Sequence, residues 1–335
     1  MAELRRDPIV GRWVIIETDE PKLPADFEKE EHVFKQTTNC PFCYGNEKLT
    51  PPEIVSVRAM GTQSNTPGWS VRVVPNKFPA LQIEGDLNRR GIGIYDLTNG
   101  IGAHEVIVET PYHTKSITDL LDDEVHHVVE TYCHRAMDLI RDKRFKYILV
   151  FKNYGVSAGA SLEHSHTQII ALPMVPKNMT EELQGAQQYF DYRERCIFCD
   201  MVYQEYQDKE RIVTENRNFV AFCPYASRFP FEVWIVPKKH NPYFCHVSRE
   251  EMADCGKMLR EVLRRVKVAL SDPSYNFIIH SAPLGEENEN SYHWHIEIMP
   301  KLTRVAGFEW GTGFYVVPTP PALAAKYLRE VENVS

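Results

Sequence analysis

Apolar and polar residues alternate over two ten-residue segments, 104–113 and 231–240, and this alternation predicts a β-strand in each. Each segment is followed by apolar residues at three- and four-residue steps, over 121–140 and 252–266. This second pattern is typical of amphipathic helices. The chain therefore contains two strand–helix units in the same order.

Each predicted helix is followed by a second strand and then by a His-x-His motif. Apolar runs typical of strands begin at residues 146 and 276. The two motifs are His164-Ser-His166 and His293-Trp-His295, and each leads into a further apolar strand. Both units thus end with a pair of histidines whose side chains would share one face of a strand.

A C-x-x-C pair precedes each unit, and the spacing between shared features is nearly equal in the two copies. His113 lies 51 residues before His164, and His240 lies 53 residues before His293. Only the stretch from the second cysteine to the first histidine differs, with 70 residues in one copy and 41 in the other. We infer a duplicated α+β unit, with halves at 1–174 and 175–335.

Composition and charge narrow the classes of function. The 335 residues are 43% hydrophobic and 25% charged, and the formal net charge is −8. This balance argues against a general electrostatic hold on nucleic acid or on an anionic membrane. The sequence has no run of 18 apolar residues and no apolar signal core at its start, so we expect a cytoplasmic protein.

The cysteines and histidines complete two Cys₂His₂ sets, which suit structural zinc because four protein ligands leave no open position. The predicted ligands are Cys40, Cys43, His113 and His164 for one ion, and Cys196, Cys199, His240 and His293 for the other. A redox-active pair is the alternative for a cytosolic C-x-x-C. Reduced, buried cysteines with unrelated histidines are a second alternative.

His166 is the candidate nucleophile. A metal bound by His164 would fix the backbone beside His166, and the small-residue segment 155–163 could present backbone N–H groups to a phosphate. A neutral imidazole can attack the α-phosphorus of a nucleotide, and Gln168 could contact a non-bridging oxygen. His166 could instead be a buried structural histidine. The corresponding segment 281–292 is acidic, so only the first half is predicted to be catalytic.

The motifs Phe151-Lys-Asn153-Tyr-Gly155, Gly159-Ala-Ser161 and His164-x-His166-x-Gln168 resemble those of the galactose-1-phosphate uridylyltransferase family, within the histidine triad superfamily. The resemblance extends over essentially the whole chain. It implies two similar halves, each with an antiparallel sheet and flanking helices, assembled as a homodimer. It also implies ping-pong nucleotidyl transfer through a covalent histidine intermediate.

The resemblance also implies a role for each matching residue. His166 would be the nucleophile, and Gln168 would contact the transferred phosphate. Phe308 and Glu309 would address the sugar. The nucleotide and its phosphates would be held by Thr50, Pro51, Asn76, Asn153, Gly159, Ala160, Ser161 and Leu162.

Two features depart from the common uridylyltransferase pattern. Ser165 replaces a proline between the histidines, and only Lys22 is basic where the family tends to carry an arginine pair. Ser165 and the Ala160-Ser161 pair resemble a plant-type branch of ADP-glucose phosphorylases. The predicted substrates are UDP-glucose and a hexose 1-phosphate, with AMP transfer from ADP-glucose to inorganic phosphate as the alternative.

Two further classes stay open. A dinucleotide hydrolase would use the same histidine but pass the nucleotide to water. A zinc-knuckle nucleic-acid binder would use only the metal sites, and the acidic composition weighs against it.

Overall fold

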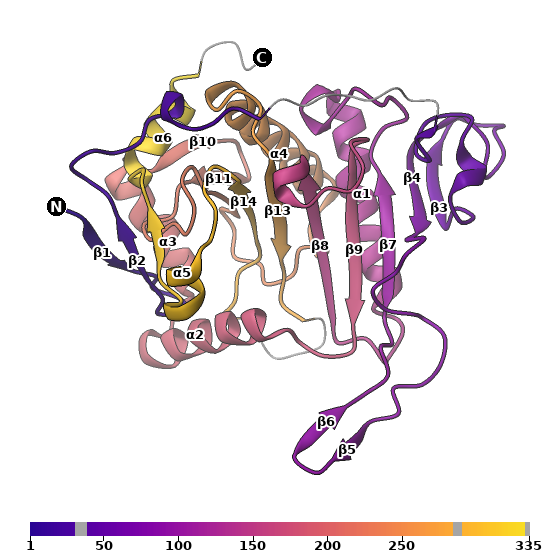
Figure 1. Ribbon diagram of the computed structural model, residues 1–335, viewed down its shortest axis with the longest axis horizontal. Helices are drawn as coiled ribbons and strands as arrows, with labels where there is room; N and C mark the ends of the chain where they lie inside the picture. The colour runs from indigo at the N-terminus through magenta and orange to yellow at the C-terminus, as the bar shows by residue number, and fades with distance from the viewer. Residues whose placement is uncertain (31–38, 284–289, 332–335) are drawn as a thin grey trace.

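The computed structural model describes residues 1–30, 39–283 and 290–331, and its centre is one ten-stranded antiparallel sheet (Figure 1). The strand order is β10-β11-β12-β14-β13-β8-β9-β7-β4-β3. The first five strands in this order come from the second copy of the repeat and the last five from the first copy. The two copies therefore meet at the pair β13–β8.

The two copies contain the same elements in the same order. The first copy consists of β3 (Val55–Arg58), β4 (Trp69–Pro75), β7 (Ala103–Val108), α1 (Asp122–Leu139), β8 (Tyr147–Tyr154) and β9 (His166–Leu172). The second consists of β10 (Ile212–Glu215), β11 (Phe219–Phe222), β12 (Val233–Pro237), α4 (Arg249–Ala269), β13 (Tyr275–His280) and β14 (His295–Pro300). The predicted duplicated, histidine-triad-like α+β fold is confirmed.

The two predicted antiparallel sheets are joined edge to edge. Strands β8 and β13 pair over five residues, from Tyr154 opposite Tyr275 to Val150 opposite Ile279. Edge strands with free N–H and C=O groups invite such pairing, and here each copy covers the inner edge of the other. The outer edges are β3 and β10.

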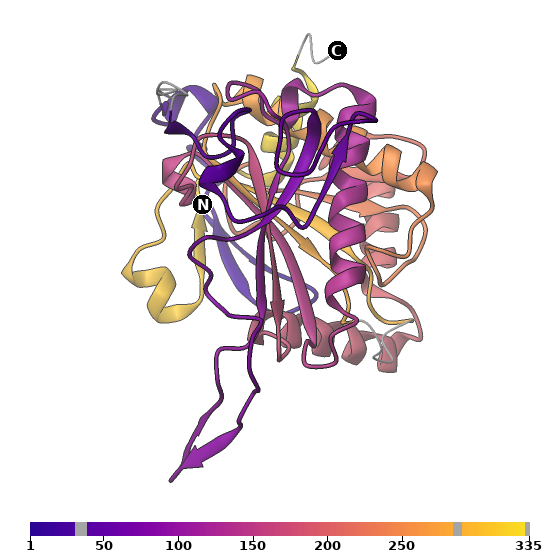
Figure 2. The ribbon, with the colours of Figure 1, turned by 90° about the vertical axis from the view of Figure 1, so that its right-hand side faces the viewer.

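Helices α1 and α4 lie together on one face of this sheet and enclose the main core (Figure 2). The core takes alternate residues from the strands, such as Ile169 and Ala171 of β9, together with the apolar stripes of both helices. The helices approach closely at Gly256, where a Cβ would lie 3.2 Å from the carbonyl oxygen of Val125. A side chain there would push the helices apart.

The opposite face is covered unequally in the two copies. Over the second copy, α2 (Lys177–Arg193) and α3 (Ile197–Asp208) pack on side chains that include Trp234 and Val236. Over the first copy, a smaller cluster forms around Phe42, Trp69 and Val106, to which none of the described α-helices contributes. Helix α2 also links the first copy to the second in the sequence.

Residues from both ends of the described chain form a separate three-stranded sheet. Strands β1 (Glu3–Arg6) and β2 (Trp13–Ile16) pair with each other, and β15 (Tyr315–Val317) pairs with β2 in parallel. The short helix α5 (Gly307–Thr312) and helix α6 (Pro321–Arg329) flank β15 in the sequence.

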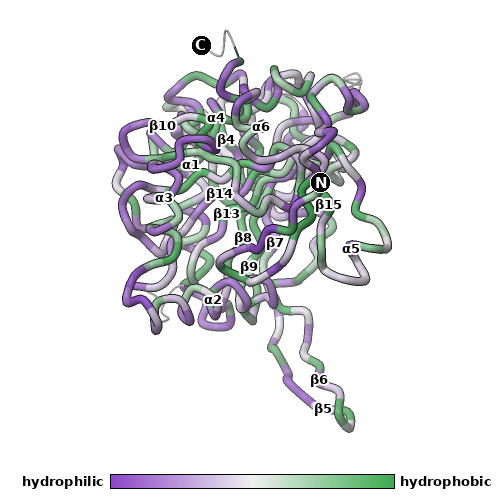
Figure 3. Tube along the Cα trace, turned by 90° about the vertical axis from the view of Figure 1, so that its left-hand side faces the viewer, coloured by the Kyte–Doolittle hydropathy of each residue, from purple (hydrophilic) through white to green (hydrophobic). Residues whose placement is uncertain are grey.

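A two-stranded hairpin extends away from the body of the molecule. It consists of β5 (Arg90–Ile92) and β6 (Tyr95–Leu97), and its tip is hydrophobic (Figure 3). Ile94 at the tip is 90% exposed.

None of the described helices is both long enough and apolar enough to cross a bilayer.

Candidate active site and metal centres

The first predicted ligand set comes together between the cysteine turn and the strands. The Sγ of Cys43 lies 3.4 Å from Nδ1 of His113 and 3.5 Å from Nδ1 of His164, and the Sγ of Cys40 lies 3.6 Å from Nδ1 of His164. In a tetrahedral zinc site, bond lengths of roughly 2.3 Å to sulfur and 2.0 Å to nitrogen separate S and N by about 3.5 Å. The four side chains therefore fit one such cation.

The hydrogen bonds around this set also suit a metal ligand. Nε2 of His164 donates to the carbonyl oxygen of Thr110 over 2.7 Å, so its Nδ1 carries the lone pair that faces the sulfurs. Burial, with Cys40 adding to it, raises the pKa of Cys43 to about 12. A cation is what would hold this sulfur as a thiolate at neutral pH.

The second predicted set has the same arrangement. The Sγ of Cys199 lies 3.4 Å from Nδ1 of His240 and 3.5 Å from Nδ1 of His293, and the four potential ligand atoms, including that of Cys196, lie within 4.8 Å of one another. The cysteines flank the start of α3, so a cation here would tie this helix to the sheet.

His166 begins β9 and is 6% exposed. Its Nδ1 donates to the carbonyl oxygen of His164 over 2.7 Å, which leaves the lone pair on Nε2. Burial, with the charge of Lys152 adding to it, lowers the pKa of His166 to about 4. The imidazole is therefore neutral at physiological pH, as a nitrogen nucleophile must be.

Gln168 is oriented by a residue to which sequence reasoning gave no role. Nδ1 of His104 accepts from the N–H of Ala80, so Nε2 of His104 carries the proton and donates to Oε1 of Gln168 over 2.8 Å. The amino group of Gln168 is thus left to act as a donor. Nδ2 of Asn76 lies 3.1 Å from the same Nε2, so His104 brings two predicted site residues together.

The small-residue segment forms a closed loop beside β8. Gly159 has φ +86°, and its N–H donates to the carbonyl oxygen of Val156, while the N–H of Ala160 donates to Gly155. The amides of Gly159 and Ala160 thus shape the loop itself. Asn153 lies against this loop, with its Nδ2 3.9 Å from where a Cβ of Gly159 would be.

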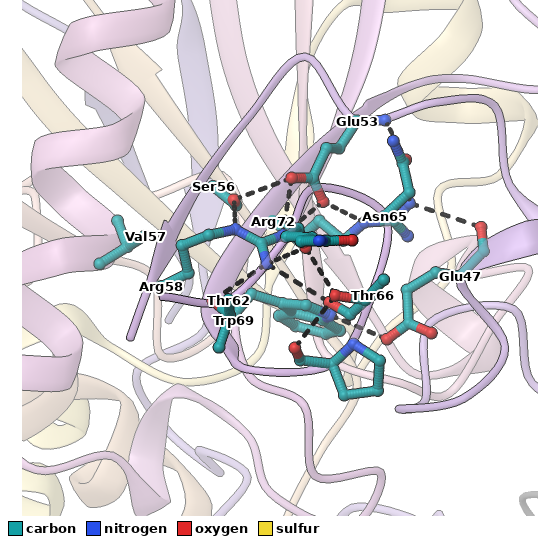
Figure 4. Close-up of polar contacts among 12 residues, drawn as sticks. Glu47, Glu53, Ser56, Val57, Arg58, Thr62, Asn65, Thr66, Trp69 and Arg72 are labelled. Atoms are coloured by element: carbon teal, nitrogen blue, oxygen red, sulfur yellow. Dashed lines mark hydrogen bonds and ion pairs between the residues drawn. The ribbon is translucent and has the colours of Figure 1, made fainter. Parts of the chain in front are cut away.

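Thr50 and Pro51 follow the short helix η3 (Glu47–Leu49), where a buried polar network fixes the chain (Figure 4). Arg72 is fully buried, and it donates to Oγ1 of Thr50 over 3.0 Å and to Glu53 over 3.1 Å. The hydroxyl of Thr50 in turn donates to the carbonyl oxygen of Glu47. This hydroxyl is therefore engaged within the protein, and its role in holding a nucleotide stays a prediction.

A buried ion pair lies behind the histidine strand, on the face covered by α1. Nζ of Lys152 donates to Glu109 over 2.6 Å and to the carbonyl oxygen of His166 over 2.9 Å. The hydroxyl of Ser165 donates to the same carboxylate over 2.6 Å. Burial opposes ionisation of Glu109, but Lys152 and the hydroxyl donors lower its pKa. Ser165, which departs from the common family pattern, thus joins a network that fixes the backbone of His166.

Sequence comparison places the chain among known enzymes. The family model described as "Galactose-1-phosphate uridyl transferase, N-terminal domain" matches residues 1–176. A second model, described as a domain of unknown function (DUF4921), matches residues 101–334. The chain is 36% identical to ADP-glucose phosphorylase of Arabidopsis thaliana, over 98% of this chain and 93% of that one. It belongs to the galactose-1-phosphate uridylyltransferase family. Within the family, the uridylyltransferase of Thermotoga maritima is 30% identical over 99% of both chains.

Solved structures of family members agree with the fold. The crystal structure of the Arabidopsis ADP-glucose phosphorylase with bound ADP-glucose has a TM-score of 0.84 at 35% identity, and covers 99% of each chain. A uridylyltransferase structure has a TM-score of 0.76 at 28% identity, over 98% of this chain and 97% of that one. The resemblance stated from motifs is therefore confirmed.

In this family member the second copy of the site is filled. His295 occupies the place of His166, and its Nδ1 donates to the carbonyl oxygen of His293. Its ring stacks between Trp234 at 4.6 Å and His280 at 4.7 Å, and its Nε2 lies 3.3 Å from Glu182 of α2. A ring enclosed by aromatic groups and a carboxylate has no room for a phosphate. Residues 284–289 of the acidic segment lie outside the described part of the chain.

The two predicted sugar-binding residues lie elsewhere in the chain. Phe308 and Glu309 are on α5, which Figure 1 shows well separated from β9 and Figure 3 shows beside β15. Phe308 is 48% exposed. The structure therefore does not bring these two residues together with His166 in one chain.

The filled site predicts how stability depends on pH. Burial opposes protonation of His280, but Glu182 and Glu297, at 3.0 and 3.2 Å from its ring nitrogens, raise its pKa to about 10. Since this pKa is higher folded than unfolded, the stabilisation is complete below about pH 6.5 and is lost as the pH rises through 10. We expect the free energy of unfolding to fall by a few kcal/mol over this range.

Urea unfolding at several pH values measures this effect. The variant His280→Gln should show a shallower decline than the unaltered chain. His127→Gln, at a half-exposed histidine of α1, should keep the full decline. Equal slopes for all three proteins would contradict the assignment of a proton to His280.

Proposed function

We propose that this chain transfers a nucleoside monophosphate from a nucleotide sugar to a phosphate-bearing acceptor, with His166 as the covalent carrier. The observation that carries this proposal is the hydrogen bond from Nδ1 of His166 to the carbonyl oxygen of His164. Nε2 then holds an in-plane lone pair at the end of β9, beside Gln168.

Each step exchanges one bond to the α-phosphorus. In the first, Nε2 of His166 bonds to phosphorus, and the bond to the sugar phosphate breaks, with its electrons leaving on the phosphate oxygen. In the second, a phosphate oxygen of the acceptor attacks and His166 leaves with its electron pair. The leaving group is an anion already, so protonation by a general acid is unnecessary. The amino groups of Gln168 and Asn153 would stabilise the charge on the phosphate oxygens.

We propose ADP-glucose as the nucleotide sugar and inorganic phosphate as the acceptor. Whole-length identity of 36% to the Arabidopsis ADP-glucose phosphorylase supports this choice over the uridylyltransferase reaction. Ser165 supports it too, because it replaces the proline that is common between the two histidines of the uridylyltransferases. UDP-glucose with a hexose 1-phosphate stays the alternative.

The intact mass of the protein after incubation with each nucleotide sugar tests this function. With ADP-glucose, we expect a mass increase of one AMP, lost on adding inorganic phosphate. His166→Ala should form no adduct, whereas His127→Ala should form it fully. An adduct only from UDP-glucose would establish the uridylyltransferase alternative. Free nucleotide without an acceptor product would indicate a hydrolase, and no adduct from either sugar would overturn the proposal.

We propose that both Cys₂His₂ sets hold zinc in structural sites. None of the eight cysteines, all of them within the described residues, forms a disulfide, which suits a protein of the reducing cytoplasm. The first ion would hold His164 and so the strand that carries His166, while the second would hold α3. On this proposal, residues 1–174 form the catalytic half, and residues 175–335 support it.

Metal analysis of the purified protein is the corresponding test. We expect two zinc ions per chain. Cys43→Ser and Cys199→Ser should each lose one of them, and Cys245→Ser should keep both. Cys43→Ser should also lose most of its adduct formation, because the strand of His166 is released. A protein that retains full activity after complete removal of metal would contradict the structural role.

We also propose that the functional unit is a homodimer in which α5 of one chain completes the site of the other. The separation of α5, which carries Glu309, from β9, which carries His166, supports this arrangement. The projecting hairpin supports it as well, because an isolated two-stranded hairpin is marginally stable in water. Its exposed Ile92, Ile94 and Tyr95 would then be buried in the dimer.

Mixing two inactive variants tests the shared site. His166→Ala and Glu309→Ala would each be inactive alone. After exchange of subunits at equal concentrations, half of the dimers would be mixed, and each would hold one intact site, so about a quarter of the original activity should return. As a control, His166→Ala mixed with His127→Ala should be active before any exchange of subunits, because His127→Ala is active by itself. Absence of any recovery in a confirmed mixed dimer would show that α5 does not act across the interface.

A further inference from the structure

Asn276 lies at the junction of the two copies, beside the phosphate loop of the first. It is on β13, directly opposite Asn153 of β8. Its Nδ2 donates to Oδ1 of Asn153 over 2.8 Å and to the carbonyl oxygen of Ala158 over 2.9 Å, and it lies 3.4 Å from the carbonyl oxygen of Lys152. One side chain from the second copy thus contacts both predicted phosphate-binding elements of the first.

These contacts determine which way Asn153 points. Two of the three acceptors around Asn276 are backbone carbonyls, which cannot donate, so the amino group of Asn276 must face them. That same amino group then requires an oxygen from Asn153. The amino group of Asn153 is therefore turned away from Asn276 and toward Gly159, at the inner side of the loop.

We propose that Asn276 is a positioning residue for nucleotidyl transfer. It holds the carboxamide of Asn153 with its N–H donors toward the phosphates, and it ties the loop at Ala158 to the second copy. This inference rests on the proposed function of His166. It gives the second copy a role at a site whose reacting atom belongs to the first.

A purely structural role for Asn276 is separable from this one. Strands β8 and β13 pair over five residues, and beside Asn276 the ring of Tyr275 stacks on that of Tyr154, with 4.8 Å between the ring centres. The hydroxyl of Tyr154 also donates to Asp272, at the turn before β13. Loss of the Asn276 amino group should therefore leave the sheet intact while the orientation of Asn153 changes.

Asn276→Asp tests the proposal with almost no change in shape. A carboxylate cannot donate to Ala158 or Asn153, so Asn153 would rotate to donate toward residue 276 and turn its oxygen toward the phosphate. We expect the rate of adduct formation with ADP-glucose to fall on the order of a hundredfold, as when a donor to a developing anion is removed. Ile278→Val, two residues along the same face of β13, should keep the original rate.

A double-mutant cycle separates positioning from general damage. Asn153→Ala should also slow the reaction, and adding Asn276→Asp to it should cost less than about threefold more, because the group on which Asn276 acts is gone. Full additivity of the two changes would overturn the proposal. So would an Asn276→Asp protein that reacts at the original rate.

Calorimetric binding of ADP distinguishes failure of this inference from failure of the proposed function. If no adduct forms with either sugar but Asn276→Asp weakens ADP binding at least tenfold relative to Ile278→Val, the covalent mechanism is wrong and the positioning role stands. If the chain forms the adduct and Asn276→Asp changes neither rate nor affinity, only the positioning role is wrong. A chain that neither binds ADP nor forms an adduct overturns both.

Discussion

The imidazole and the backbone carbonyl of His164 act on different partners, and the orientation of His166 depends on both. Nδ1 of His164 faces the sulfurs of Cys40 and Cys43, while the backbone carbonyl oxygen of His164 accepts a hydrogen bond from Nδ1 of His166. A cation held by this ring would therefore also fix the tautomer and direction of the ring two residues later. On the other face of the strand, Lys152 holds the carbonyl of His166. Both the side chain and the backbone of His166 are therefore held in place.

Duplication has supplied two such segments, and their neighbours differ. The site face of the first copy carries Val106 opposite Gln168, whereas the second carries Trp234 opposite Glu297. The indole lies on the ring of His295, and α2 adds Glu182 above it. The second copy thus carries a buried charged cluster, which also includes Arg228, where the first copy carries Gln168 and His104. The second copy still contacts the predicted phosphate-binding residues of the first through β13, whose pairing with β8 places Asn276 opposite Asn153.

Spacing alone was enough to predict the repeat, both ligand sets and the histidine strand, because these depend on residues at fixed separations. Spacing did not predict the register of the individual strands. The Glu-Val pairs of 104–113 and 231–240 match in the sequence, yet Glu105 contacts Arg135 of α1 while Glu232 contacts Trp234 on the opposite face. The second strand is offset by one residue, which exchanges its faces. His104 and Asn276 were missed because their contacts join distant strands. The exposed position of α5 could not be predicted, since no local pattern reports which side of the fold a helix occupies.

The small sheet of β1, β2 and β15 has a consequence for the order in which the molecule is built. β2 pairs in parallel with β15, whose residues lie some three hundred positions later, and the N–H of Lys22 donates to Pro318. During synthesis, β2 can pair with β1 at once, but its second partner, β15, is made some three hundred residues later. Closing so long a loop carries a large entropic penalty, so this sheet is expected to be among the last parts to form. The same pairing joins a strand of the first half to a strand of the second, so β2 can separate only when its hydrogen bonds to both β1 and β15 are broken.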